Sequence, residues 1–274
     1  MFSVFKIFSH FSLCLASGKC LASVMRHFFF LQYKVALFPG KIPLSDVDNP
    51  LDAAVPFKPE WVAVYLDFST FWIRTQGFLL EAFGRRALPF ARDFILSMGG
   101  LYRKAAEVYA RNVSTTRRPR YLGNLRFILI HAVDPHLMCI PSLHVMVVIR
   151  AYTAFRAMVG ALGGEARFAA EVDDVRRHAL AIAESILYVK QHSVNCIPAA
   201  MYAMTRFDGA LFPPEEAERF VGSLFASADG MGAEDVAAIK SRIVGLYAEF
   251  LREGEGAEDW TEPLVEFLRL RRRP

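Results

Sequence analysis

Apolar residues recur at helical spacing through most of this chain, and short polar or proline-rich stretches separate the apolar segments. An apolar, aromatic stretch over residues 7–37 predicts a first helical region, and the five prolines within residues 39–59 predict a loop after it. The same spacing predicts further helices over residues 61–84, 87–110, 122–133, 142–160 and 166–190. Nothing in the pattern indicates a strand, so we expect an all-α fold.

The lengths of the apolar segments leave membrane embedding open. A helix that crosses a bilayer needs about 20 predominantly apolar residues. The longest runs without a charged residue, 135–149 and 191–205, have only 15 residues each. Residues 127–149 contain one charge, at Asp134, and form the best candidate span. Charged residues are tolerated in such helices when they face a bundle interior. An apolar helical protein that only touches the bilayer would show the same pattern.

The chain changes after residue 205 from a mainly apolar to an acidic composition. Residues 206–274 hold nine Lys and Arg against 14 Asp and Glu, whereas the whole chain carries a net charge of +4. Pro213 and Pro214, followed by two glutamates, indicate a helix start. A helical apolar stripe follows at Val236, Ile239, Ile243, Leu246 and Phe250. We expect a helical domain over residues 1–205 and a small soluble appendage over 206–274, which either caps the domain or binds a partner protein.

Composition narrows the class of protein. A hydrophobic content of 54% and 24 Phe residues favour a protein in or on a membrane. The basic residues are dispersed among apolar segments and form no recognition motif, which argues against nucleic-acid binding. The four cysteines lack metal-ligand spacing and a disulfide pattern, so we expect no metal site and no cofactor.

Three short motifs lie in order within the apolar part of the chain. They are Arg111-x6-Arg118-Pro119, then Pro141-Ser142-Leu143-His144, then Ser185-x6-His192. Cleavage of a phosphate ester needs fixed cations and donors around the phosphate oxygens. The forked guanidinium groups of Arg111 and Arg118 match those oxygens, and the Ser142 hydroxyl can add a donor.

The two histidines complete that chemistry. One imidazole can attack phosphorus while the other protonates the leaving oxygen, and this scheme needs no metal. Taken singly, His144 would be a core histidine, Arg118 part of a solvated basic loop and Ser185 a helix-surface hydroxyl. Only the ordered combination predicts a site. If the match were coincidental, His144, His192 and Arg118 would lie far apart in the fold.

The three motifs together resemble those of the type 2 phosphatidic acid phosphatase superfamily, K-x6-R-P, P-S-G-H and S-R-x5-H-x3-D. The resemblance covers about residues 100–205 and is closest to the inositol-phosphorylceramide synthase-like branch. It implies a helical membrane bundle, His192 as the nucleophile and His144 as the general acid. It also implies phosphate binding by Arg111, Arg118, Ser142 and Ser185.

Two positions depart from the family pattern. Ile186 replaces an arginine, and in the resembling branch a lysine such as Lys190 often accompanies that loss, so Lys190 could supply the missing cation. Cys196 replaces the aspartate that orients the nucleophilic imidazole. Asn195, Asp134 or Glu184 could take over that role.

The resemblance thus implies an integral membrane enzyme that hydrolyses or transfers the phosphate of a lipid through a phosphohistidine. The alternative is a protein of the same fold that has lost catalysis and only binds phosphorylated lipid or a partner protein. The degenerate third motif motivates that alternative.

Overall fold

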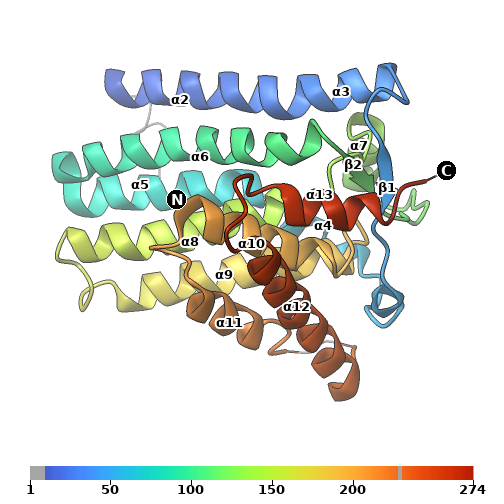
Figure 1. Cartoon of the computed structure of the whole chain (residues 1–274). Helices are drawn as coiled ribbons and strands as arrows, with labels where there is room; N and C mark the ends of the chain where they lie inside the picture. The colour runs from blue at the N-terminus through green and yellow to red at the C-terminus, as the bar shows by residue number, and fades with distance from the viewer. Residues whose placement is uncertain (1–9, 228–229, 274) are drawn as a thin grey trace.

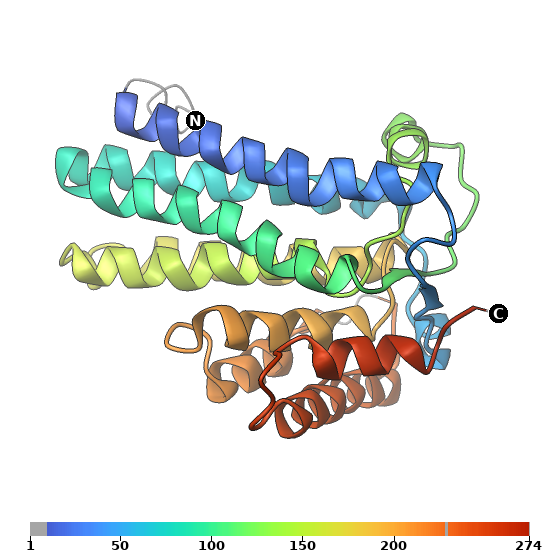
Figure 2. The ribbon, with the colours of Figure 1, turned by 45° about the horizontal axis from the view of Figure 1, so that its top comes forward.

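Long helices that run side by side form most of the structure (Figure 1). The computed structural model describes residues 10–227 and 230–273. An N-terminal helix consists of α2 (Phe11–Val24), a π-helical turn (Met25–Phe29) and α3 (Phe30–Leu37). It packs against α6 (Leu88–Tyr109) and forms the outermost layer in both views (Figures 1 and 2). The predicted first helical region is therefore helical from Phe11, while residues 7–9 lie outside the described part.

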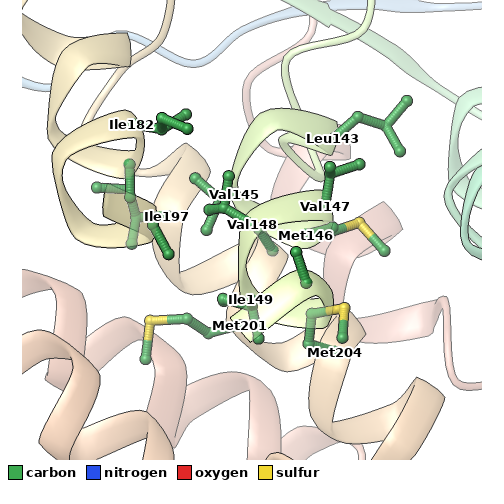
Figure 3. Close-up of a cluster of buried hydrophobic side chains, with 14 of the residues drawn as sticks. Leu143, Val145, Met146, Val147, Val148, Ile149, Ile182, Ile197, Met201 and Met204 are labelled. Carbon is green, nitrogen blue, oxygen red and sulfur yellow. The ribbon is translucent and has the colours of Figure 1, made fainter. Parts of the chain in front are cut away.

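Five further helices form the apolar core together with α6. They are α4 (Val62–Leu66), α5 (Phe68–Phe83), α8 (Leu143–Ala161), α9 (Ala169–Tyr188) and α10 (Cys196–Asp208). Helix α8 lies at the centre, and its side chains interdigitate with Ile182 of α9 and with Ile197, Met201 and Met204 of α10 (Figure 3). Short 3-10 turns at Pro50–Ala53, Pro59–Trp61 and Gly84–Ala87 connect the helices. The expected all-α class is confirmed at this level.

The candidate span over residues 127–149 is wrong. Helix α7 (Leu125–Val133) ends before Asp134, and α8 begins only at Leu143. Pro135 and the cis-bonded Pro141 lie in the segment between them, which carries polar groups of the candidate site. Among the described residues, Leu143–Ala161 alone is long and apolar enough to cross a bilayer, and 72% of its apolar window is buried inside the bundle. Length and composition alone do not distinguish a membrane span from a buried core helix.

Two other predicted helix boundaries shift for local reasons. The predicted helix over 61–84 is interrupted at Asp67, where α4 ends and α5 begins. The predicted helix over 166–190 ends at Tyr188, shortly before Lys190, which has a positive φ of 53°. A turn follows, and Pro198 lies in the first turn of α10, where a proline is tolerated.

A two-stranded parallel sheet is present although the sequence pattern indicated no strand. Strand β1 (Leu44–Asp46) pairs with β2 (Val113–Thr115), with Leu44 opposite Val113. Near the chain end, Arg272 forms an antiparallel bridge with Ser45. Three-residue strands are too short to show alternation, which explains why periodicity missed them. The sheet fixes the start of the loop that carries Arg118.

The C-terminal segment packs against the bundle through one continuous core. It contains α11 (Pro214–Ser223), α12 (Ala233–Glu253) and α13 (Glu262–Arg269). The predicted stripe on α12 is buried at Ile239, Ile243, Leu246 and Phe250, whereas Val236 is half-buried. Helix α10 crosses the expected boundary at residue 205, and Tyr202 on it donates a hydrogen bond to the Trp260 carbonyl. The segment therefore has the contacts expected of a cap.

Candidate active site

Polar side chains from four loops and helix ends gather at one end of the bundle. Arg118 comes from the loop after β2, and Asp134 and His136 come from the segment after α7. His144 lies in the first turn of α8, and His192 lies in the tight turn between α9 and α10. The loops bring together residues that are up to 74 positions apart in the chain.

The rings of His144 and His192 are neighbours, with centroids 5.4 Å apart and planes inclined at 66°. His144 is held between two aromatic rings: its centroid lies 4.3 Å from that of Tyr65, which stacks on it, and 4.0 Å from that of Phe68. Such packing restricts the orientation of the imidazole. The two histidines of the second and third motifs therefore share one pocket.

Three polar atoms of this cluster are buried without a hydrogen-bond partner among the described residues. They are Nε2 of His144, Nδ1 of His192 and Oγ of Ser142, which precedes α8. Buried polar atoms in folded proteins are nearly always paired, so the two histidine nitrogens, whose rings line one pocket, require an explanation. A polar ligand bound between the two rings would satisfy both.

Burial keeps both histidines neutral. It lowers the pKa of His144 to about 3, with the charge of Asp134 opposing the shift. Burial also lowers the pKa of His192 well below its ordinary value, and the neighbouring His144 and His136 add to that shift. A neutral imidazole retains a lone pair on one ring nitrogen, which a nucleophile or proton acceptor needs.

These shifts predict that the protein loses stability in mild acid. Because the unfolded chain binds protons on His144 below about pH 6.5 and the folded chain does not, the free energy of unfolding falls as the pH decreases. His144 alone would account for about 2 kcal/mol at about pH 5. The free energy of unfolding in urea, measured at neutral pH and at about pH 5, checks this. In a His144→Gln variant the loss should be smaller by that amount, and an unchanged loss would refute it.

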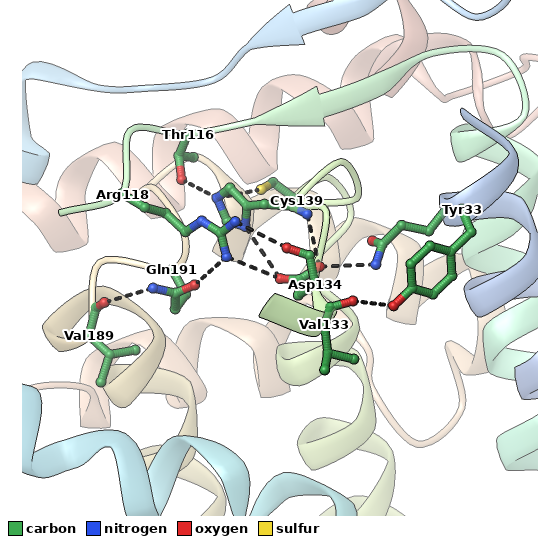
Figure 4. Close-up of polar contacts among 10 residues, drawn as sticks. Tyr33, Thr116, Arg118, Val133, Asp134, Cys139, Val189 and Gln191 are labelled. Carbon is green, nitrogen blue, oxygen red and sulfur yellow. Dashed lines mark hydrogen bonds and ion pairs between the residues drawn. The ribbon is translucent and has the colours of Figure 1, made fainter. Parts of the chain in front are cut away.

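Arg118 joins the loop of the first motif to the turn of the third (Figure 4). Its Nη1 donates to Oε1 of Gln191 at 3.1 Å, and its Nη2 donates to the backbone carbonyl of Asp134 at 3.1 Å. The Asp134 carboxylate lies 3.5 Å from the same guanidinium. Because Gln191 directly precedes His192, Arg118 is bonded to the residue next to one of the two histidines.

Sequence reasoning missed His136, the third histidine of the site. Its Nε2 lies 2.9 Å from Oγ1 of Thr116, and its Nδ1 lies 3.7 Å from the Asp134 carboxylate. Its ring centroid is 6.4 Å from that of His192. Burial would raise the pKa of Asp134, but hydrogen bonds and charge from His136, together with Arg118, lower it to about 2. No motif contains His136, and only its proximity to Asp134 could have suggested it.

Three residues expected to bind phosphate have other partners. Arg111 forms an ion pair with Asp259 and donates to Oγ1 of Thr261 in the C-terminal segment. Ser185 is fully buried and donates to the Ile182 carbonyl of its own helix at 2.7 Å. The Lys190 ammonium donates to the backbone carbonyls of Asp52 and Val55. Of the expected residues, the structure thus brings His144 and His192 together and bonds Arg118 to the residue next to His192, while Ser142 is buried two positions before His144.

Of the residues considered as substitutes for the missing aspartate, one lies at the candidate site and two have partners elsewhere. Asp134 belongs to the cluster, whereas Asn195 donates to the Val47 carbonyl and Glu184 accepts from the Phe225 amide. Cys196 is buried at the start of α10, and burial raises the pKa of its thiol well above the ordinary value. Within residues 10–227 and 230–273, no carboxylate hydrogen-bonds the His192 ring.

His192 lies between two pockets of different character. The inner pocket is small, at about 50 Å³, and has walls of Phe28, Tyr65, Phe68 and Tyr102, with His144 and His136 at its polar end. The outer pocket is polar and is lined by Asp48, Asp52, Arg117, Thr116 and Lys190. In the described part of the chain, no three His, Cys, Asp or Glu side chains are grouped so that they could hold a metal ion.

Comparisons with known proteins found no relative of this chain. The chain matches no family model, no curated protein and no solved structure. Inference about function therefore depends on the geometry of this site and on the motifs.

Proposed function

We propose that this protein hydrolyses or transfers the phosphate of a lipid through a phosphohistidine on His192, as an enzyme of the type 2 phosphatidic acid phosphatase kind. The observation that carries the proposal is the convergence of His144 and His192, each with a buried ring nitrogen that lacks a partner in the described residues, with Arg118 bonded to the adjacent Gln191. An integral membrane location remains a prediction.

In the proposed first step, the neutral imidazole of His192 attacks phosphorus and the bond from phosphorus to the ester oxygen breaks. The negative charge of the bound phosphate raises the pKa of His144, which takes up a proton and gives it to the leaving oxygen. Arg118 offsets the charge that develops on the phosphate oxygens. In the second step, His144 accepts a proton from water or an alcohol, which attacks phosphorus and releases His192.

The two pockets support a lipid as the substrate class. The aromatic walls of the small inner pocket suit the apolar atoms next to a lipid phosphate, and the polar outer pocket suits water or a polar alcohol. Because His192 contacts both, it is positioned to receive phosphoryl from one side and to pass it to the other. This arrangement accommodates hydrolysis and transfer equally.

Release of inorganic phosphate tests the proposal. Full-length protein purified in detergent should release phosphate from short-chain phosphatidic acid in mixed micelles, and excess EDTA should leave the rate unchanged. Strict dependence on an added metal ion would contradict the proposed route.

One observation favours a second candidate, a phosphate-binding protein without turnover. Nδ1 of His192 lacks the orienting carboxylate that the family pattern has, and Cys196 stands at the corresponding position. In that case the protein would bind the lipid phosphate in the same assay and release none.

A further inference from the structure

Exposed apolar side chains are concentrated on the outermost layer of the fold. Thirteen of the fifteen large apolar side chains that are exposed in the described residues lie in residues 11–38 or 122–133. We call these two segments the apolar face. Phe11, Phe30 and Leu37 on the N-terminal helix are 85%, 64% and 73% exposed, and Leu125 and Leu129 on α7 are 70% and 55% exposed. An exposed apolar surface of this extent marks an interaction site.

The two segments meet at the end of the bundle that carries the histidines. The hydroxyl of Tyr33 on α3 donates to the Val133 carbonyl on α7, and Gln32 donates to the Asp134 carboxylate at 3.0 Å. Figures 1 and 2 both show the end of α3 close to α7. The apolar face is therefore continuous across the α3–α7 contact.

The charged residues on the apolar face indicate which kind of partner binds it. Residues 10–45 and 117–133 contain no Asp or Glu. The exposed Lys19, Arg26, Lys34 and Arg126 form no ion pair within the described residues. A second copy of the chain would bring like charges together, whereas an anionic, apolar partner complements the face. A bilayer that contains anionic lipid has both properties.

The acidic segment lies away from this face. Residues 206–274 carry the net negative charge, and α11 and α12 lie on the opposite side of the bundle from α2 in both views (Figures 1 and 2). Docking through the apolar face would therefore keep the acidic helices away from an anionic surface.

We propose that residues 11–38 and 122–133 dock the protein on a bilayer that contains anionic lipid, so that the inner pocket can receive a lipid from that side. Phe28 and Gln32, from the same N-terminal helix, line the inner pocket. The docking surface itself is independent of catalysis, and the delivery of substrate rests on the proposed function.

Flotation with lipid vesicles tests the docking surface. The full-length protein should float with vesicles of phosphatidylcholine and phosphatidylserine, more weakly with phosphatidylcholine alone, and less at high salt. A Phe30→Glu/Leu129→Glu variant replaces two exposed side chains and should lose roughly tenfold or more in vesicle affinity. Val244→Glu, at an exposed position on α12, is the matched control and should bind as the unmodified protein does.

The outcomes separate docking from catalysis. The double variant should keep its turnover of a water-soluble phosphate ester, since neither position lines the pocket. Vesicle binding without phosphate release would leave the docking surface standing and overturn the proposed enzyme. Equal vesicle binding by the double variant, or a dimer that this variant dissociates, would overturn the docking surface.

Discussion

Replacement of His192 with Ala is expected to reduce phosphate release by roughly a thousandfold or more, because it removes the group that forms the covalent intermediate. The variant loses the hydrogen bond of the ring to the Cys139 backbone, whereas Nδ1 has no partner in the described residues, so its stability must be measured with its rate. Initial rates of phosphate release from a lipid phosphate, together with the free energy of unfolding of each variant, would measure the effect.

Ser185→Ala is the control for this experiment. Ser185 belongs to the same motif, but its hydroxyl is bonded to the Ile182 carbonyl of its own helix. Its removal should change the rate by about threefold or less, since the lost bond contributes only about 1 kcal/mol to stability. Retained turnover in His192→Ala, or an equally large loss in Ser185→Ala, would contradict the assigned roles.

Replacement of Arg118 with Ala is expected to lower turnover by about a hundredfold to a thousandfold, because it removes the cation beside the histidine pair. Arg118→Lys should recover little of the loss. The guanidinium fork bonds Gln191 and the Asp134 carbonyl at the same time, and a lysine ammonium cannot reproduce both bonds in that geometry.

Arg120→Ala provides the matched control for Arg118. It removes an exposed arginine from the same loop. Its rate should equal that of the unmodified protein. Unfolding measurements on Arg118→Ala are needed alongside the rates, because the variant also removes a cation from beside the Asp134 carboxylate. A normal rate in a folded Arg118→Ala protein would exclude Arg118 from phosphate binding.

Helical periodicity predicted the long helices well because their apolar faces are buried. The expected helices over 87–110 and 142–160 correspond to α6 and α8 within two residues at each end. The predicted helices over 122–133 and 142–160 also left residues 134–141 outside a helix, as the structure does. Pro135 and Pro141 disfavour a helix there, whereas the contacts of Asp134 with Arg118 and of His136 with Thr116 left no local signal.

The motifs predicted residues at the centre of the candidate site, but they also included residues that lie outside it. His144 and His192 meet because the start of α8 lies beside the turn between α9 and α10, and Arg118 reaches that turn through Gln191. Arg111 keeps the expected spacing from Arg118, but β2 lies between them and Arg111 pairs with Asp259. A partner 148 positions away in the chain leaves no local signal. His136 also left no local signal, because Thr116, which contacts its ring, is 20 positions away in the chain.

The apolar face changes how the composition of the chain is explained. High hydrophobic content suggested helices that cross a membrane, yet most apolar side chains of α8 are buried inside the bundle. The exposed apolar side chains lie mainly on the N-terminal helix and on α7. Contact with lipid through that face would account for them and bring the inner pocket close to its proposed substrate.

The most direct test of the central claim is to locate the phosphoryl group during turnover. The protein would be mixed with a lipid phosphate, quenched in alkali within the first turnover, digested and examined by mass spectrometry. We predict an alkali-stable, acid-labile phosphoryl group on the peptide that contains His192, and its absence from the His192→Ala variant. Phosphate release with the phosphoryl group on another residue, or with none on the protein at any time, would contradict the account.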